Sequence, residues 1–574
     1  MITKNKKLFV ILGTTALCVF AVAGVFKYFD YQESVFPKIE AIPVNISAAV
    51  LPHHDLAKSE RIALLQGLAN KVHPKTIILV SPNHFDTGKS YFITTDKTWK
   101  LSNSIINPAK KEIDALVAGG GVSSDANAFD REHGISNILD DLYTTFPDAN
   151  LLPVIIKQSA PEESVAKLSK NLLTACPKDC LLLASVDFSH YQPGALATIH
   201  DSLSVRALAD VDENLIYQAE VDSPQALALA ISWAKAQNTE RFTLQKETNS
   251  GEISGEPDAE STSYVSGWFE KGEKTSLEEM TFQIGGDMMF DRMISYRYPQ
   301  NNLVNVMKNL GDRFFWGTDA SIVNLEGPIA ESYAKPNIAV NNLSFRFPPK
   351  TVDVLKYLHL DGASLANNHT LNGGTAMLAN TKAVLLNAGI AAIGDQTHVG
   401  EQTFNYQKNN ITVITINTLE DGTNLESRIK AAKATGNFVL VFPHWGSEYS
   451  QTHSRSQEVL ARAWIDAGAD LVIGSHPHVV QDAQVYKGKP IFYSLGNLVF
   501  DQTFSAETQR GLVIAGKISA DKLTLVLLPV ISKNLQPELL RGEDRFNLIS
   551  KFREELGAEK VGNSYGFDII ELSR

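Results

Sequence analysis

The sequence predicts an α/β fold, made of two α/β domains behind an N-terminal transmembrane helix, and three observations predict it. The chain of 574 residues is too long for one hydrophobic core, because single cores stop growing at about 250 to 300 residues. Short apolar runs that end in polar or histidine-bearing residues alternate with helical patterns along both halves, as expected for α/β domains. The uncharged run at residues 8–26 is long enough to cross a bilayer.

The N-terminal apolar run predicts where the protein resides. A lysine-rich segment, residues 1–7, precedes residues 8–26, and Lys27 follows them. Positive charges stay on the cytoplasmic side of a membrane helix, so we expect a single-pass protein of the cell membrane with residues 1–7 in the cytoplasm and the bulk of the chain outside it. A cleaved signal peptide is the alternative, because residues 21–23 read Ala-Val-Ala,, and the protein is then secreted.

Composition narrows the classes of partner. The chain carries 52 basic and 64 acidic residues, a formal net charge of −12, which argues against nucleic acid as a partner. Hydrophobic residues make up 44% and charged residues 20%, values typical of folded domains rather than of disordered chains. Cys176 and Cys180 flank residues 177–179; outside the cytoplasm they either close a small disulfide loop or remain free thiols.

Polar segments indicate the domain boundaries. A turn-rich stretch at residues 246–260 precedes one more strand-like run, and a short charged segment follows that run,. The predicted divisions are a first domain at residues 44–270, a linker at 271–280, a second domain at 281–535 and a tail at 536–574 that contains a helix. Within the second domain, residues 456–469 have apolar residues at helical spacing and Gly468 near their end, so we expect a core-facing helix there.

Metal-ligand types follow the strand-like runs of the second half. The candidates in chain order are Asp287, Asp291, Glu326, Asn367, Asn368, His369, His444, His476 and His478. Residues just past the carboxyl ends of strands meet in one crevice of an α/β sheet. Carboxylate, amide oxygen and imidazole together bind divalent metals, and several ligands from separate strands suit a two-metal site. The sequence therefore predicts a metal centre in this half.

The motifs that carry these residues resemble a known family. Gly-Gly-Asp-Met, Asn-Leu-Glu-Gly, Ala-Asn-Asn-His, His-Trp-Gly-Ser-Glu-Tyr and Gly-Ser-His-Pro-His occur in this order and resemble the bacterial capsule-synthesis, poly-γ-glutamate (CapA-like) family over residues 282–532. The resemblance implies a metallophosphoesterase-like four-layer α/β sandwich and two divalent ions, with Mn, Fe, Zn and Mg not distinguished. It implies that His369 is the general acid and that the metal ligands are Asp287, Glu326, Asn368, His444, His476 and His478.

Two residues depart from the pattern of related phosphoesterases. Met289 stands where they have the histidine of an Asp-x-His pair, and Asn372 stands where family members commonly have aspartate. The first change removes an imidazole ligand, and the second removes a carboxylate that would orient His369. Beside His444, Trp445 and Tyr449 are either packing residues, which we favour, or stacking platforms for a ligand.

Imidazole and carboxylate side chains also follow strand-like runs in the first half. The motifs Leu-Pro-His-His-Asp, Ser-Pro-Asn-His-Phe, Arg-Glu-His-Gly and Ser-Val-Asp-Phe-Ser-His-Tyr resemble the Memo-like family, which includes proteins called AmmeMemoRadiSam system protein B, over residues 44–270. The resemblance implies the fold of class III non-haem iron extradiol dioxygenases. It implies a pocket for iron or copper lined by His53, His84, Asp187 and His190.

The sequence leaves two questions about this first-half pocket. A cysteine that some members contribute is absent, and Asp222 stands near its place as the candidate substitute. His133 either lines the pocket or satisfies a buried backbone carbonyl.

The sequence supports three functional hypotheses. The first is a membrane-anchored phosphoesterase-like hydrolase or transferase that acts in capsule or poly-γ-glutamate synthesis, with an anionic surface polymer or its precursors and polymer synthase subunits as partners. The second is a non-catalytic accessory that binds the polymer or recruits the synthase, which Met289 and Asn372 favour. The third places redox or dioxygenase-type chemistry in the Memo-like domain.

Overall fold

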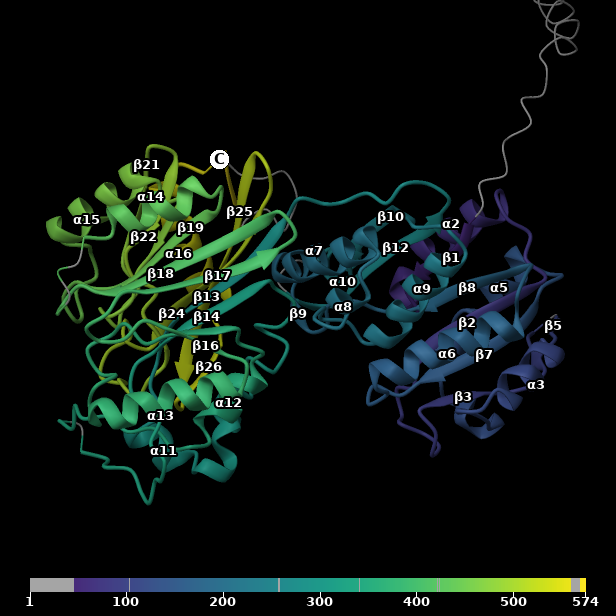
Figure 1. Ribbon diagram of the computed structural model, residues 1–574, viewed down its shortest axis with the longest axis horizontal. Helices are drawn as coiled ribbons and strands as arrows, with labels where there is room; N and C mark the ends of the chain where they lie inside the picture. Colours follow the sequence, from purple (N-terminus) through teal and green to yellow (C-terminus); the bar gives the residue numbers. More distant parts are fainter. Residues whose placement is uncertain are drawn as a thin grey trace, which may run out of the picture. The chain divides into compact units, whose positions relative to one another are not determined.

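The computed structural model describes residues 46–573 except 103, 257–258, 340, 421, 423 and 559–567 (Figure 1). The predicted cytoplasmic end and transmembrane segment, residues 1–7 and 8–26, lie outside the described residues. None of the helices described is both long enough and apolar enough to cross a membrane.

The first half of the described chain builds one eight-stranded sheet, and its strands follow the order β10-β12-β1-β8-β2-β7-β3-β6. The strands are β1 (Ile46–Leu51), β2 (Thr76–Pro82), β3 (Phe92–Thr94), β6 (Val122–Ser124), β7 (Asn150–Ile156), β8 (Cys180–Ser185), β10 (Arg241–Asn249) and β12 (Ser263–Glu270). The four central strands β1, β8, β2 and β7 are parallel. Their carboxyl ends therefore lie at one edge, where the histidine-bearing motifs follow.

Helices cover this sheet on both faces. The longer helices are α2 (Lys58–Ala69), α3 (Lys110–Ala118), α5 (Leu139–Thr145), α6 (Glu162–Ala175), α7 (Gly194–Asp210) and α9 (Pro224–Ala236). Alternate strand residues such as Val80 and Leu182 pack with α3, α6 and α9 in one apolar cluster. Their neighbours Leu79 and Leu183 point to the opposite face and are equally buried,. Burial on both faces explains the continuous apolar runs of these strands.

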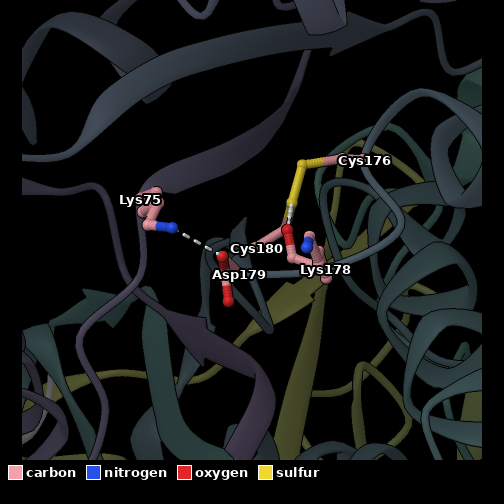
Figure 2. The surroundings of a disulfide bond; sticks show 5 residues. All are labelled: Lys75, Cys176, Lys178, Asp179 and Cys180. Atoms are coloured by element: carbon pink, nitrogen blue, oxygen red, sulfur yellow. Dashed lines mark hydrogen bonds and ion pairs between the residues drawn. A yellow bond between two sulfur atoms is a disulfide. The ribbon is translucent and has the colours of Figure 1, made fainter.

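A disulfide joins Cys176 and Cys180 (Figure 2). Cys176 directly follows α6 as its C-cap residue, and Cys180 is the first residue of β8. Beside the bond, Lys75 Nζ lies 3.0 Å from Asp179 Oδ2. Of the two alternatives that the sequence left open for these cysteines, the structure has the closed loop.

The second half builds two sheets. The nine-stranded sheet contains β13 (Met280–Met288), β14 (Ala320–Leu325), β15 (Gly362–Ser364), β16 (Ala391–Ile393), β23 (Asn497–Val499), β24 (Arg510–Ile518), β25 (Lys522–Lys533), β26 (Gln536–Leu539) and β27 (Ile569–Ser573). The six-stranded sheet contains β17 (Gly400–Tyr406), β18 (Asn409–Asn417), β19 (Phe438–His444), β20 (Leu471–Ile473), β21 (Ala483–Tyr486) and β22 (Lys489–Phe492). Parallel pairing joins β13 to β14 and β14 to β15 in the first of these sheets, and β18 to β19 and β19 to β20 in the second.

These two sheets pack face to face between two layers of helices. One apolar cluster, with Ile284, Leu440 and Ile514 among its members, fills the space between the sheets. The helices are α11 (Arg292–Arg297), η3 (Gln300–Met307), α12 (Thr351–Tyr357) and α13 (Gly374–Asn387) over the nine-stranded sheet, and α14 (Glu426–Ala434) and α15 (Arg455–Ala467) over the six-stranded sheet (Figure 1). The second half is therefore a four-layer α/β sandwich.

Local sequence signals account for α15. Ser454 and Gln457 form a capping box at its start, and Gly468 ends it with φ 118°, a conformation that glycine adopts without steric cost. Trp464 and Ile465 face the core. The helix predicted at residues 456–469 is therefore present, shifted by one or two residues.

The segment expected as a tail belongs to the second half. The helix expected within the tail at residues 536–574 is α16 (Gly542–Glu555), which adds Ile549 and Phe552 to the cluster between the sheets. Strands β26 and β27 both pair with β25. Sequence periodicity missed these two strands because each is short and only partly buried.

From residue 46 onward the described chain forms one compact unit. Arg206 of α7, which is fully buried, binds both carboxylate oxygens of Asp319. Arg313 Nη1 lies 2.5 Å from Oε1 of Glu220, which is also fully buried. The sheets divide the chain between β12 and β13, and these two ion pairs link the segments on either side of that division.

Candidate metal centres

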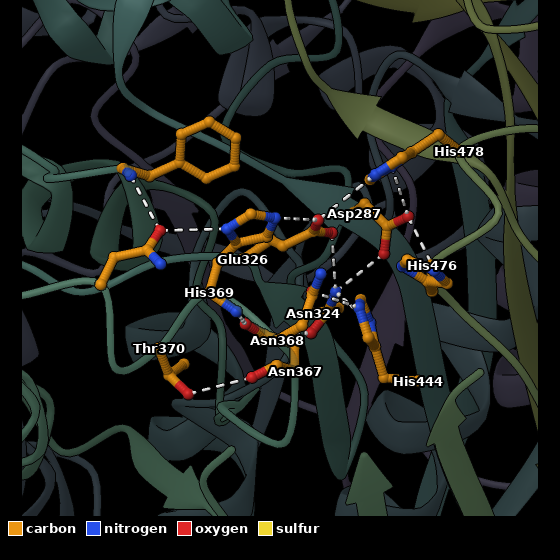
Figure 3. A network of polar contacts seen from close by, with 12 residues as sticks. Asp287, Asn324, Glu326, Asn367, Asn368, His369, Thr370, His444, His476 and His478 are labelled. Atoms are coloured by element: carbon orange, nitrogen blue, oxygen red, sulfur yellow. Dashed lines mark hydrogen bonds and ion pairs between the residues drawn. The ribbon is translucent and has the colours of Figure 1, made fainter. Parts of the chain in front are cut away.

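The predicted ligands of the second half meet where parallel strands of both sheets end (Figure 3). Asp287 lies at the end of β13, and Glu326 directly follows β14. His444 is the last residue of β19, while His476 and His478 follow β20. The side chains converge because the carboxyl ends of β13 and β14 in one sheet and of β19 and β20 in the other face the same crevice.

Two buried carboxylates form the centre of the site. Asp287 and Glu326 have no exposed surface. His478 lies between them, with Nδ1 3.2 Å from Asp287 Oδ2 and Nε2 3.3 Å from Glu326 Oε1. The amide of Asn324 donates hydrogen bonds of 2.8 Å to Asp287 and 3.3 Å to Glu326. Asn324 is a polar residue inside a buried strand, and sequence reasoning missed it although that placement in Asn-Leu-Glu-Gly was a usable signal.

Asn368 and His444 meet across the two sheets. Asn368 Oδ1 lies 2.9 Å from His444 Nε2. The other ring nitrogen of His444 lies 3.2 Å from the hydroxyl of Ser475. His444 is buried and Asn368 is half-buried, so the amide oxygen and the imidazole present ligand atoms side by side.

Ligand atoms gather in two groups of three that share no residue. Asp287, Glu326 and His444 form one group, and Glu448, His476 and His478 form the other; within each group the ligand atoms lie within 4.8 Å of one another. Glu448 is the glutamate of the His-Trp-Gly-Ser-Glu-Tyr motif, which sequence reasoning quoted without assigning the residue a role.

The donors fit divalent cations. Two buried atoms have no hydrogen-bond partner among the described residues: Nδ1 of His476, and Oε1 of Glu326, which has the 3.3 Å ion-pair contact with His478. Buried polar atoms are rarely left unpaired, and a cation would satisfy both. Carboxylates, imidazoles and an amide oxygen are the donors that two-metal centres use.

Burial and mutual charge set the protonation of these groups. Burial raises the pKa of the Glu326 carboxyl well above its usual value. Burial lowers the pKa of His444 well below its usual value and that of His476 to about 4, so both rings are neutral, as metal ligands must be. Burial opposes protonation of His478 too, but Glu326 and Asp287 raise its pKa to about 9. A bound cation would replace that proton as the counter-charge of the two carboxylates.

His369 is held in one orientation by Asn372. Asn372 Oδ1 accepts a 2.8 Å hydrogen bond from the backbone N–H of Phe345 and lies 3.0 Å from His369 Nδ1. Because the Phe345 N–H can only donate, Oδ1 is the acceptor in both contacts, and His369 carries its proton on Nδ1. The opposite nitrogen, Nε2, then points toward the carboxylates, 3.9 Å from Glu326 Oε1.

Burial lowers the pKa of His369, so its neutral form presents a lone pair at Nε2. Proton donation from this nitrogen needs the imidazolium, and here an amide stands where a carboxylate would stabilise it. His369 is therefore placed for proton transfer. The amide of Asn372 stabilises its imidazolium form less than a carboxylate at that position would.

Other sequence candidates lie away from the ligand groups. Met289 is fully buried, and its side chain packs in the apolar cluster beneath α11 and α12. Asp291 caps α11 and accepts a hydrogen bond from Tyr333 at 2.6 Å. Trp445 is buried and stacks on Trp464, so it is a packing residue, as favoured.

Tyr449 differs from the sequence interpretation. It was favoured as a packing residue, yet it is 44% exposed. A further residue, Asn497, contacts the second-half centre, because its Oδ1 lies 3.0 Å from Nδ1 of His478.

The first half contains a separate group of three histidines. His53 follows β1, His84 follows β2 and His133 begins α4 (His133–Ser136), and their ligand atoms lie within 4.8 Å of one another. The rings of His84 and His133 are 3.9 Å apart between centroids. His133 therefore lines the pocket, the first of the two alternatives that the sequence left open.

Two aspartates lie against this group. Nε2 of His53 is 3.4 Å from Asp187 Oδ2 and 3.5 Å from Asp222 Oδ2, and Nε2 of His84 is 3.8 Å from the same Asp222 oxygen. Asp222, the candidate substitute for the absent cysteine, thus reaches two of the three histidines. His190 is not part of the three-histidine group; its backbone N–H donates to the buried Glu220.

The surroundings of His53 and His84 shift their pKa values in opposite directions. Burial lowers the pKa of His53 to about 4. For His84 burial acts in the same direction, but Asp222 and Glu132 outweigh it and raise the pKa to about 9. Glu132, which is fully buried, lies 2.5 Å from His84 Nδ1. Sequence reasoning missed Glu132, although it directly precedes His133 in the Arg-Glu-His-Gly motif.

Comparisons with known proteins match the two halves of the chain separately. A family model described as Memo-like protein matches residues 30–268, and one described as bacterial capsule synthesis protein PGA_cap matches residues 281–502. The PGA biosynthesis protein CapA of Bacillus subtilis is 29% identical over 251 residues, which cover 40% of this chain and 65% of that protein. The chain thus spans slightly less than two thirds of this relative's length.

Two further relatives match one half each. A MEMO1 family protein of Methanosarcina barkeri is 31% identical over 235 residues, which cover 39% of this chain and 87% of that protein. A probable polyglutamine synthesis accessory protein of Mycobacterium tuberculosis is 25% identical over 281 residues, covering 41% of this chain and 70% of that protein. Both family resemblances expected from the sequence are confirmed: the chain belongs to the MEMO1 family through its first half and carries a bacterial capsule-synthesis PGA_cap domain in its second.

Proposed function

We propose that this chain is a membrane-anchored, extracytoplasmic protein whose second half is a metal-dependent phosphoesterase-like enzyme acting in capsule or poly-γ-glutamate synthesis. The observation that carries the proposal is the convergence of two groups of ligand atoms, Asp287 with Glu326 and His444, and Glu448 with His476 and His478. The four-layer sandwich around them is the architecture that the resemblance to calcineurin-type phosphoesterases implies.

Bound metal ions and protein side chains would each supply part of the proposed reaction. Bound divalent ions would lower the pKa of a coordinated water and polarise a phosphoryl oxygen. Asp287 and Glu326 would hold one of these ions, and Asn324 fixes the orientation of both carboxylates. His369, as the imidazolium, donates a proton from Nε2 to the leaving oxygen.

The proposed location and partners rest on three observations. The uncharged run at residues 8–26 follows a lysine-rich segment, which supports a single-pass anchor. The disulfide between Cys176 and Cys180 is in keeping with an oxidising compartment outside the cytoplasm. The names of two matched relatives refer to PGA biosynthesis and polyglutamine synthesis, which supports an anionic surface polymer or its precursors as the substrate and synthase subunits as partners.

Hydrolysis of a generic phosphodiester tests whether the second half is a phosphoesterase. With Mn²⁺ added, we expect the wild-type chain to hydrolyse bis(p-nitrophenyl) phosphate and His476→Ala to lose most of that activity. His398→Ala is the matched control, because the His398 side chain is 77% exposed and lies outside both ligand groups. Equal activity in His476→Ala and wild type would exclude the proposal.

A second candidate is a non-catalytic accessory that binds the polymer or recruits a synthase. The neutral amide of Asn372 against His369 favours it, as does the burial of Met289 in the core, because each removes a group that phosphoesterases use. Metal analysis separates the two: less than about one ion per second half favours the accessory, since two-metal hydrolysis needs both positions filled.

The first half supports a third candidate, redox or dioxygenase-type chemistry. The group of His53, His84 and His133, with Asp222 beside it, offers ligands that suit iron or copper. Anaerobic loading with Fe²⁺, followed by measurement of oxygen consumption with a catechol, tests this candidate. A flat oxygen trace would count against it.

A further inference from the structure

Glu448 stands at the open side of the second-half centre. It is exposed, whereas His476 and His478, the two other members of its group, are buried. The group of Asp287, Glu326 and His444 is buried throughout. One set of ligand atoms is therefore closed by protein, and the other reaches solvent through Glu448.

The backbone brings Glu448 to the two histidines. The N–H of Tyr449 donates a 2.8 Å hydrogen bond to the carbonyl of Pro477, which lies between His476 and His478. This bond ties the loop after β19 to the turn after β20. Backbone pairing thus holds the loop that carries Glu448 next to the turn that carries the two histidines.

The turn that carries His476 and His478 has an unusual backbone conformation. His476 has φ 98° and His478 has φ 58°, conformations that residues with a side chain rarely adopt and that concentrate at functional sites. Nδ1 of His476 is buried without a hydrogen-bond partner among the described residues. A ring nitrogen held in this way is suited to bind a cation.

We propose that Glu448 is the third protein ligand of a second divalent ion, held with His476 and His478, beside the ion held by Asp287, Glu326 and His444. Two imidazoles and one glutamate leave open coordination positions, and because Glu448 faces solvent these positions admit the oxygens of a phosphate ester. This inference rests on the proposed function only in requiring that the centre binds metal.

Metal binding to the full chain tests the role of Glu448 without an activity readout. Apoprotein is titrated with Mn²⁺, and electron paramagnetic resonance detects the spin coupling that arises between two ions about 3.5 to 4 Å apart. Wild type is expected to give a coupled pair. Glu448→Gln is expected to retain one tight ion and to lose the coupling, with the second affinity lowered at least about tenfold, since loss of even an outer-shell partner costs that much.

Two controls make the result specific. Glu331→Gln removes the same charge from another exposed glutamate and is expected to keep the coupled pair. The titration is repeated in a His84→Ala, His133→Ala background, so that an ion bound in the first half does not enter the count. Equal melting temperatures of Glu448→Gln and wild type, both as apoprotein, verify that the variant is folded.

The outcomes separate this inference from the proposed function. A coupled pair of unchanged affinity in Glu448→Gln overturns the role of Glu448. A single ion in both wild type and Glu448→Gln overturns it as well, yet leaves a metal-binding second half intact. Absence of any tight Mn²⁺ in wild type overturns the proposed function together with the inference.

Discussion

The Nε2 atom of His444 lies 2.9 Å from the Oδ1 atom of Asn368, although 76 residues separate them in the chain. His444 ends a strand of the six-stranded sheet, and Asn368 follows a strand of the nine-stranded sheet. Their contact places the second-half centre at the line where the carboxyl ends of the two sheets meet. Ligands from both sheets are required, so the centre depends on the packing of the whole sandwich.

Metal removal is expected to destabilise the second half. Without a cation, Asp287 and Glu326 are two buried carboxyl groups near each other, and His478 lies between them. An ion that binds only the folded state adds about 2.7 kcal/mol when its free concentration is about 100 times Kd. Scanning calorimetry should show a higher melting temperature with Mn²⁺ than with a chelator.

His444→Ala provides the comparison for this measurement. The variant removes a ligand from the buried group, so the melting temperature should respond to Mn²⁺ less than that of wild type does. A wild-type melting temperature that is indifferent to Mn²⁺ and to chelator would contradict the expectation.

Sequence patterns were sufficient to locate most of the second-half site. Asp287, Glu326, His444, His476 and His478 each end or follow a buried apolar strand, and parallel pairing brings such positions together. The helix α15 was equally predictable, because its cap residues and apolar spacing agree. Apolar periodicity and helix capping are local sequence signals, so the strand-end site residues and helix α15 could be predicted from them.

Replacing Asn372 with aspartate is expected to strengthen proton donation by His369. A carboxylate 3.0 Å from Nδ1 would stabilise the imidazolium that donates from Nε2. The gain should be largest for esters with poor leaving groups, since p-nitrophenolate leaves without protonation. Rates of Asn372→Asp and wild type are compared for p-nitrophenyl and simple alkyl phosphodiesters.

The Asn372→Asp result is read as a ratio of the two rates. An alkyl-to-nitrophenyl ratio that rises over wild type supports proton transfer by His369. An unchanged ratio, with both variants equally loaded with Mn²⁺, would contradict that role.

The first-half histidines are expected to bind metal independently of the second half. His133→Ala removes one of three ligands and should lower the affinity for Fe²⁺ at least about tenfold. The same variant should hydrolyse phosphodiesters at the wild-type rate. His73→Ala is the control, because His73 is exposed and lies outside the group.

Fe²⁺ titration and phosphodiester hydrolysis are measured on the same preparations. Parallel loss of both properties in His133→Ala would show that the two centres are coupled. Unchanged Fe²⁺ affinity would show that His133 is not a ligand.

The disulfide is expected to contribute modestly to stability. Cys176 and Cys180 enclose a short loop with a sequence separation of 4, and closing so short a loop stabilises by about 2 kcal/mol in the chain-entropy account. The double variant Cys176→Ser, Cys180→Ser should lower the free energy of unfolding by about that amount in urea. Equal unfolding curves would show that the bond adds no stability.

Other residues were missed because their roles depend on tertiary contacts. Asn324 and Glu132 lie within the sequence motifs, but only the fold shows that their side chains contact ligand side chains. The loop that carries Glu448 is likewise joined to the histidine turn by the hydrogen bond from the Tyr449 N–H to the Pro477 carbonyl. The short strands β26 and β27 likewise form because β25 offers edges to pair with, which no local periodicity records.

Anomalous X-ray diffraction tests the central claim most directly. Crystals of the protein soaked in Mn²⁺ are measured at the manganese absorption edge. The structure predicts strong peaks within about 2.0 to 2.6 Å of ligand atoms of Asp287, Glu326, His444, His476 and His478, the distances at which divalent ions bind protein ligands. A map with no anomalous peak among these side chains would contradict the claim that the crevice is a metal centre.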